Sequence, residues 1–112
     1  MLISFHTKKI EKECNDLKVL TRQYGDIQVK LIARRLAELA AADNLETLRF
    51  LPQVRAHELK GSRARQISLD VKHPYRLLVV PDYAAPPCKP DGGLDWQKIT
   101  KVKILGVVDT HE

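Results

Sequence analysis

The spacing of the apolar residues changes once along the chain, near Pro52. Before this point apolar residues recur every three or four positions, which is the spacing of one face of an amphipathic helix. We expect one helix over residues 10–23 and a second over residues 27–42, where the apolar stripe is longest: Ile27, Leu31, Ile32, Ala33, Leu36, Leu39 and Ala40. The "YGD" at residues 24–26 separates the two helices, because glycine suits the end of a helix and Asp26 can cap the next one.

Two shorter segments complete the first half of the chain. Residues 2–5 are apolar and predict a first strand or a cap on the core. The "DNLETL" at residues 43–48 predicts a short helical piece, capped by Asp43 or Asn44 and stopped by Pro52. Because a short turn joins the two long helices, they are expected to form an antiparallel hairpin.

After Pro52 the apolar period becomes two, which is the period of a β-strand. Candidate strands cover residues 56–60, 66–72, 75–80 and 101–112, and a connector rich in Pro and Gly spans residues 82–100. In the second of these strands Ile67, Leu69 and Val71 face one way, while Gln66, Ser68, Asp70 and Lys72 face the other. The order of elements predicts an α+β fold, with an N-terminal helical hairpin packed on a small antiparallel β-sheet. The other face of the sheet would remain open.

Length and composition suit one folded domain over residues 1–112, since 44% of the residues are hydrophobic and 29% are charged. No apolar run is long enough for a membrane span, and the first residues lack the apolar centre of a secretory signal. The two cysteines lie far apart, and the four histidines show no zinc-ligand spacing. We therefore expect a cytoplasmic protein with reduced thiols, no metal, no cofactor and no membrane partner.

The charge balance points to an anionic partner. The net charge is +5 and the isoelectric point is about 9.4, which favours nucleic acid or an acidic protein segment. Each basic residue also has an ordinary solvated role. Arg76 is the exception, because an arginine among aliphatic residues must pair, extend to solvent or face a ligand. Alternation along the last strand groups Asp109 and His111 on one face, so Arg76 and His111 could share the open face if their strands are neighbours.

Together these residue types match the needs of RNA cleavage. The ribose 2′-OH attacks the adjacent phosphate once a base accepts its proton, and an acid protonates the departing 5′-oxygen. Imidazole transfers protons near neutral pH. Lysine and arginine stabilise the charge that grows on the phosphoryl oxygens. This chemistry requires no metal.

Three segments resemble the RelE/ParE superfamily of bacterial toxins from type II toxin–antitoxin modules, and specifically its HigB, or plasmid-maintenance killer, branch. They are "RAHELKGSRARQISLDV" at residues 55–71, "HPYRLLV" at residues 73–79 and "VVDTH" at residues 107–111. The resemblance covers nearly the whole chain. It implies a RelE-like, microbial-RNase-like fold and a ribosome-dependent mRNA endonuclease, or mRNA interferase, that cuts mRNA in the ribosomal A site. It also implies that a cognate helix-turn-helix antitoxin, HigA-like, holds the toxin inactive.

The resemblance also implies roles for individual residues. His57 and His111 would be the acid and base, and Lys60 and Arg76 would stabilise the phosphate. Asp109 would orient His111 or a base. The basic residues around them would contact the RNA backbone: Arg55, Arg63, Arg65 and Lys72.

Two features depart from the family pattern. Residues 83–100 form an insertion between the last two strands, expected to be an ordered excursion with Trp96 as its packing anchor. The family's "Y-W-S" after the turn is "Q-I-S" at residues 66–68, so a base-stacking role there is in doubt.

The alternative is a non-catalytic binding protein of the same fold. It could be a ParE-like toxin that inhibits DNA gyrase, or a killer-suppression regulator. His57 and His111 argue against the gyrase inhibitor, since ParE-like sequences generally lack this set of residues. The absence of a helix-turn-helix pattern in the sequence argues against an antitoxin.

Overall fold

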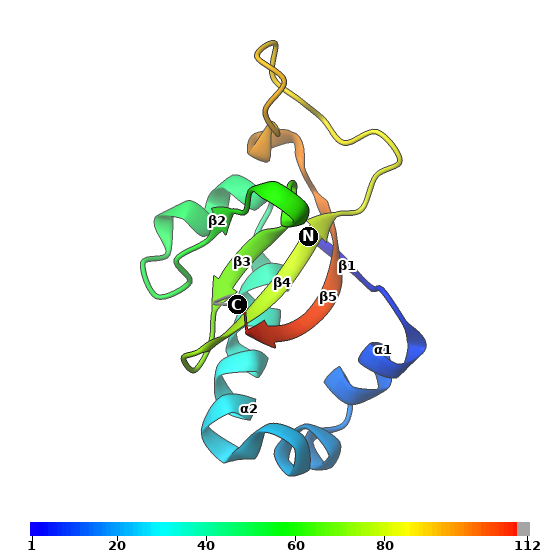
Figure 1. The fold of residues 1–112 in the computed structure, drawn as a ribbon, viewed down its shortest axis with the longest axis vertical. Coiled ribbons are helices and arrows are strands. Elements are labelled where there is room, and N and C mark those ends of the chain that lie inside the picture. The colour runs from blue at the N-terminus through cyan, green and yellow to red at the C-terminus, as the bar shows by residue number, and fades with distance from the viewer. Residues whose placement is uncertain (110–112) are drawn as a thin grey trace.

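The computed structural model describes residues 1–109, which form an α+β fold with a five-stranded mixed sheet (Figure 1). The helical elements are α1 (Lys8–Cys14), α2 (Leu17–Ala41) and the 3₁₀ turns η1 (Leu45–Phe50), η2 (Gly61–Arg63) and η3 (Trp96–Lys98). The strands are β1 (Leu2–Phe5), β2 (His57–Glu58), β3 (Ile67–Asp70), β4 (Tyr75–Pro81) and β5 (Lys101–Asp109). Their order across the sheet is β1-β5-β4-β3-β2. The expected α+β class is confirmed.

The sheet is not purely antiparallel, so that part of the prediction is wrong. β2, β3, β4 and β5 pair antiparallel in sequence order, but β1 pairs parallel with β5. The apolar pattern of residues 2–5 indicates a segment that packs on the core. It contains no information about which strand lies next to it, or in which direction.

The helical half differs from the expected two-helix hairpin. Gly25 interrupts α2 with φ +82°, so the break predicted at "YGD" is present as a kink within one long element. A second break separates α1 from α2, because the Asp16 carboxylate accepts hydrogen bonds from the Lys18 and Val19 amides and caps α2. Asn44 caps η1 through the Thr47 amide, as one of the two predicted caps.

The longer part of α2 covers one face of the sheet (Figure 1), and the other face is open only in part, because Ser68 and Leu78 on it are each 1% exposed. Between them lies the core, built from α2, η1 and the inward positions of the strands. Ile32, Leu39, Ile67, Leu69, Leu77, Val79 and Ile104 all belong to it and are fully buried. We call the face of the sheet opposite α2 the open face.

Two polar side chains of α2 are buried in this interface and bind the backbone of β3 and its turn. Gln28 accepts a hydrogen bond from the Lys72 amide at 2.7 Å and donates to the Lys72 carbonyl at 3.3 Å. Arg35 donates to the Asp70 carbonyl at 2.7 Å and to the Gln53 carbonyl at 3.1 Å. The end of β3 is therefore held in place from the helix side.

A β-bulge in β5 reverses the faces predicted for the end of the chain. Leu78 pairs with Gly106 and Val79 with Ile104, which leaves Leu105 without a partner in the ladder. After the bulge Val108 lies beside Arg76 on the open face, whereas Asp109 lies beside Tyr75 on the opposite side. The prediction that Asp109 shares a face with Arg76 is therefore wrong, because one extra residue shifts the alternation by one.

The segment at residues 83–100 is an ordered excursion, as expected. Its tip is closed by a bridge between Cys88 and Leu94, and η3 returns the chain to the body of the protein. Trp96 is buried, its Nε1 donates to the Glu58 Oε1 at 3.4 Å, and the Arg49 guanidinium lies 3.7 Å from its ring centre. The packing role predicted for Trp96 is confirmed.

Within residues 1–109, no helix combines the length and the apolar character needed to cross a bilayer.

Candidate functional site

Two adjacent rows of side chains cross the open face, and they contain two of the predicted site residues. Cross-strand partners in an antiparallel sheet point to the same side, so the register defines each row. The first row is Asp70, Arg76 and Val108. The second row is His57, Ser68, Leu78 and Gly106. The fold thus brings His57 and Arg76 to one face, in neighbouring rows.

Asp70 and Arg76 form the ion pair at the centre of this face. The Asp70 Oδ1 lies 3.2 Å from the Arg76 Nε, and the two side chains are 21% and 13% exposed. Arg76 Nη1 also donates to the Tyr75 carbonyl at 2.9 Å. The guanidinium is therefore fixed at two of its three nitrogens, and Arg76 pairs within the protein as the sequence allowed.

Arg55 approaches the same carboxylate from the chain segment before β2. Its Nη1 lies 3.5 Å from the Asp70 Oδ2, and its side chain is 72% exposed. The Arg55 backbone has φ +46°, in the left-handed region that non-glycine residues rarely occupy. Two arginines thus share one carboxylate, and the group carries a net positive charge on the open face.

His57 is exposed at the edge of the sheet, directly opposite Ser68. Its Nδ1 lies 3.5 Å from the Arg55 carbonyl, a long contact that leaves the ring accessible. The Ser68 hydroxyl oxygen is buried and has no hydrogen-bond partner among residues 1–109. Buried hydroxyls are normally paired, so this one is a ready donor or acceptor next to an imidazole.

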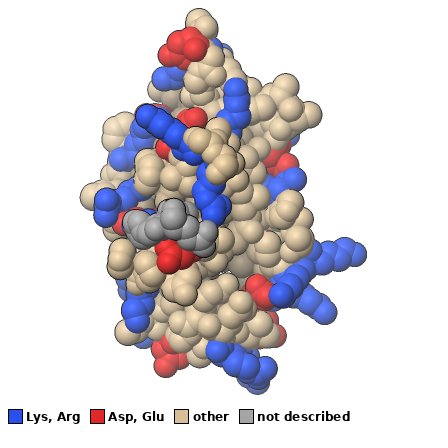
Figure 2. Space-filling view, viewed as in Figure 1, with Lys and Arg blue, Asp and Glu red and all other residues tan. Residues whose placement is uncertain are grey.

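The remaining basic residues surround this face in two groups. Lys60, Arg63 and Arg65 lie on or beside η2, in the connection that follows β2. Lys72 lies at the turn from β3 to β4 and lines a groove with Gln23 and Tyr24. Figure 2 shows Lys and Arg atoms spread over the upper half of the open face, with a few carboxylates among them.

Arg65 has a specific partner in the excursion. Its Nη1 donates to the Cys88 Sγ at 3.3 Å, and its backbone has φ +71°. The hydrogen bond and the charge of the Cys88 side chain raise the pKa of the Arg65 guanidinium, which stays charged in any case. The contact joins the η2 connection to the tip of the excursion, so Arg65 has a structural contact as well as its predicted role.

His111 lies outside the described residues, and Asp109 lies on the α2 side of the sheet. Sequence reasoning had assigned Ser68 and Asp70 only to a face, with no role. Their alternation with Ile67 and Leu69 is visible in the sequence. The register of β3 against β4, which pairs Asp70 with Arg76, is not.

Among residues 1–109, no three His, Cys, Asp or Glu side chains gather closely enough to hold a metal ion. The chemistry available on the open face is proton transfer by His57, hydrogen bonding by Ser68 and electrostatic stabilisation by the arginines.

No protein-family model matches this chain, and no curated protein or solved structure matches it either.

Proposed function

We propose that this protein is the toxin of a type II toxin–antitoxin module, with a RelE-like fold and the activity of a ribosome-dependent mRNA endonuclease. The observation that carries the proposal is the placement of His57 and the Asp70-bound Arg76 in adjacent rows of the open face. A proton-transfer group and a fixed cation are the two kinds of group that support the cleavage of a phosphodiester by its own 2′-OH.

In this reaction the imidazole of His57 accepts the proton of the 2′-OH as the oxygen attacks the adjacent phosphorus. Arg76 stabilises the added negative charge on the phosphoryl oxygens, together with Lys60, which closely follows His57 in the sequence. The 5′-oxygen departs with a proton from an acid, the role proposed for His111. The products are a 2′,3′-cyclic phosphate and a free 5′-hydroxyl, and no water is consumed in this step.

The basic residues outside the two rows suit contacts with RNA that do not depend on sequence. Three of them lie close to His57 in the sequence: Arg55, Arg63 and Arg65. Of these, Arg55 and Arg65 are exposed. Phosphate contacts of this kind position a strand without reading its bases. An acidic segment of a helix-turn-helix antitoxin would be attracted by the same charges and would block them.

One observation favours the second candidate, a non-catalytic binding protein of the same fold. Arg76 already has a carboxylate partner and is mostly buried, so it could serve the sheet alone. In that case the open face would bind an anionic surface without cleaving it. Inhibition of DNA gyrase is the activity of this class that can be assayed directly.

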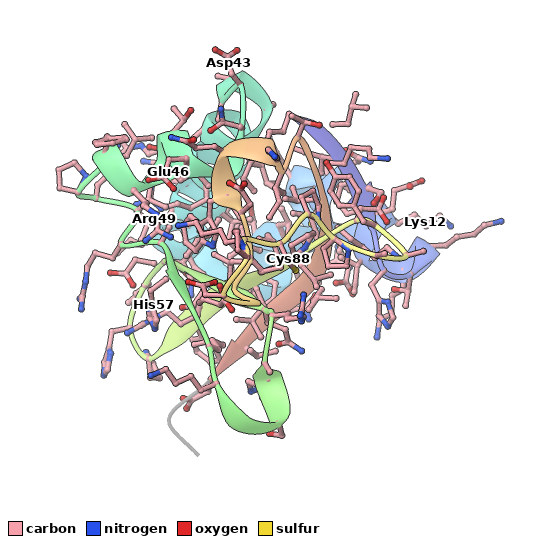
Figure 3. The ribbon with its side chains drawn as sticks, turned by 90° about the horizontal axis from the view of Figure 1, so that it is seen from above. Lys12, Asp43, Glu46, Arg49, His57 and Cys88 are labelled. Carbon is pink, nitrogen blue, oxygen red and sulfur yellow. The ribbon has the colours of Figure 1, made fainter. Side chains whose placement is uncertain are left out.

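The test is an in vitro translation reaction supplied with the purified protein, followed by primer extension on the mRNA. We expect new 5′ ends inside codons with the wild-type protein and none with His57→Ala. Lys12→Ala is the matched control, because Lys12 is an exposed basic residue on the opposite side of the molecule from His57 (Figure 3). If the wild-type protein produces no new ends but inhibits DNA supercoiling by gyrase, the binding protein is the correct function.

A further inference from the structure

We propose that Asp70 is a positioning residue, which orients Arg76 so that one edge of the guanidinium faces the scissile phosphate. This inference rests on the proposed function and assigns a role to Asp70, which the sequence pattern placed only on a face of its strand. Three observations support it: the way Arg76 is held, the way Asp70 itself is held, and the sign of its charge.

Arg76 is held so that part of its guanidinium remains available. Its Nε faces the Asp70 carboxylate at 3.2 Å and its Nη1 donates to the Tyr75 carbonyl at 2.9 Å. Within residues 1–109, Nη2 makes no hydrogen bond that would use its two donors. Because the guanidinium is planar and rigid, fixing Nε and Nη1 also fixes the direction of Nη2. The nitrogen left over is therefore aimed rather than mobile.

The backbone of Asp70 is itself held at both its amide and its carbonyl. Its amide donates to the Val54 carbonyl at 2.8 Å, and its carbonyl accepts from the buried Arg35 Nε at 2.7 Å. Arg35 is 5% exposed and is further held by the Glu38 carboxylate at 2.6 Å. A continuous series of contacts thus runs from α2 through Asp70 to Arg76. The carboxylate that orients Arg76 stands on one of the most firmly anchored residues of β3.

The charge of Asp70 opposes simple attraction of RNA. A carboxylate 3.2 Å from the cation weakens the net field that a phosphate would meet. If affinity were the only requirement, an uncharged residue at this position would serve better. Besides the pairing of the two strands, a fixed orientation is the benefit that a carboxylate here can supply, because an arginine that is already ordered loses less side-chain entropy when it meets its ligand. Orientation acts on the reacting geometry and so on the rate of the bound complex.

Positioning and attraction therefore predict different kinetics for Asp70→Asn. Attraction alone predicts tighter RNA binding and an unchanged or higher rate. Positioning predicts binding that is unchanged or tighter together with a kcat that falls about 10-fold or more. Asp70→Glu, which keeps the carboxylate, should recover part of the lost kcat.

The experiment uses the full chain and ribosomes programmed with a short mRNA. Cleavage gives kcat and KM, and a copy of the mRNA with a 2′-deoxyribose at the cleavage position gives the affinity without reaction. The variants are Asp70→Asn, Asp70→Glu, Arg76→Ala and the double variant Asp70→Asn/Arg76→Ala. Glu46→Gln is the matched control, because Glu46 forms an equivalent carboxylate–arginine pair with Arg49 on η1, at 2.8 Å. Thermal unfolding of each variant excludes loss of folding as the cause.

A second readout follows the guanidinium directly. In ¹H–¹⁵N spectra the chemical shift of the Arg76 Nε–H should change in Asp70→Asn, because the group 3.2 Å from Nε loses its charge. In the kinetics, Asp70→Asn should have no further effect on kcat once Arg76 is alanine, because Asp70 acts through Arg76.

The outcomes separate this inference from the function on which it rests. If the wild-type protein cleaves and Asp70→Asn cleaves with the same or a higher kcat, Asp70 does not position Arg76 and the inference is overturned. If Asp70→Asn lowers kcat equally in the presence and absence of the Arg76 side chain, Asp70 acts by another route and the inference is also overturned. If the wild-type protein does not cleave at all, the proposed function fails, and the inference fails with it.

Discussion

Asp70 on β3 and Arg76 on β4 are direct cross-strand partners, with 3.2 Å between the Asp70 Oδ1 and the Arg76 Nε. The pair stands between two sets of contacts: Arg35 holds the backbone of Asp70 from the helix side, and Arg55 reaches its carboxylate from the edge of the sheet. The open face thus carries a preorganised cation on β4 and an exposed imidazole on β2, and each group can be tested separately.

Replacing Arg76 with lysine should separate its charge from its geometry. A lysine keeps the positive charge beside Asp70, but it has no rigid fork that can bind Asp70 and the Tyr75 carbonyl together. We expect Arg76→Lys to fold within about 1 kcal/mol of the wild-type protein, since the pair is partly exposed, and to lose cleavage activity by about 10-fold or more. Urea denaturation and primer extension measure the two quantities. Full activity in this variant would mean that only the charge matters.

His57→Gln should abolish proton transfer without affecting the fold. The side chain is exposed at the edge of the sheet and makes only one long contact, so the free energy of unfolding should change by less than about 0.5 kcal/mol. Cleavage should fall by about 10²- to 10⁴-fold, the usual contribution of a general acid or base. His6→Gln is the control, because His6 is equally exposed but follows β1 at the other edge. Equal activity of the two variants would remove His57 from the mechanism.

Ser68→Ala should be neutral or stabilising. In the part of the chain that the structure describes, the buried Ser68 hydroxyl has no hydrogen-bond partner, and removing an unsatisfied buried group gains up to about 1 kcal/mol. A loss of cleavage in a variant that is at least as stable as the wild-type protein would show that the hydroxyl contacts His57 or the substrate during the reaction. A loss of stability would instead show that the hydroxyl has a partner in solution.

Arg35→Met should destabilise the protein strongly. Arg35 is 5% exposed and binds the Glu38 carboxylate and the carbonyls of Asp70 and Gln53. Its removal leaves buried acceptors unpaired, so we expect the free energy of unfolding to fall by about 3–5 kcal/mol. The neighbouring Arg34 is exposed on the same helix, and Arg34→Met should change stability by less than about 0.5 kcal/mol. Comparable effects of the two substitutions would contradict the role assigned to Arg35.

The two cysteines should react with an aromatic disulfide reagent at different rates at pH 8. Burial raises the pKa of the Cys14 thiol above its usual 9.0, and the nearby Glu13 carboxylate adds to the rise. A raised pKa lowers the fraction of thiolate, which is the reacting form, so Cys14 should react slowly. Cys88 is exposed and should react first. Cys88→Ser should therefore remove the fast phase, and a single fast phase for both thiols would contradict this assignment.

Much of the fold could be predicted because it depends on local periodicity. The alternation of residues 67–71 correctly placed Ile67 and Leu69 in the core, and the break at Gly25 and the cap at Asn44 follow from side-chain and backbone preferences of single residues. The second break, at Asp16, was missed because residues 10–23 keep an apolar stripe across it. When the apolar stripe of a helix continues across a possible cap residue, only the structure shows whether the helix is interrupted there.

The candidate site was predictable only in part, for a related reason. The alternation correctly grouped Ser68 with Asp70. His57 and Arg76 were singled out by their residue types, an imidazole that can transfer protons and an arginine among aliphatic residues. The bulge in β5 was not visible in the pattern. One unpaired residue, Leu105, reverses the faces of residues 106–109, and so moves Asp109 to the side of the sheet that α2 covers.

The sequence by itself thus determined which residues are apolar, the break at Gly25, the cap at Asn44 and the alternation of the strand at residues 67–70. Only the tertiary structure decided which strands are neighbours, that β1 lies parallel to β5, and that Asp70 meets Arg76. The physical reason is that the alternation of a strand is a local property of its backbone, whereas register depends on packing against elements distant in sequence. Arg35, on a helix 35 residues before Asp70, holds the strand on which that pairing depends.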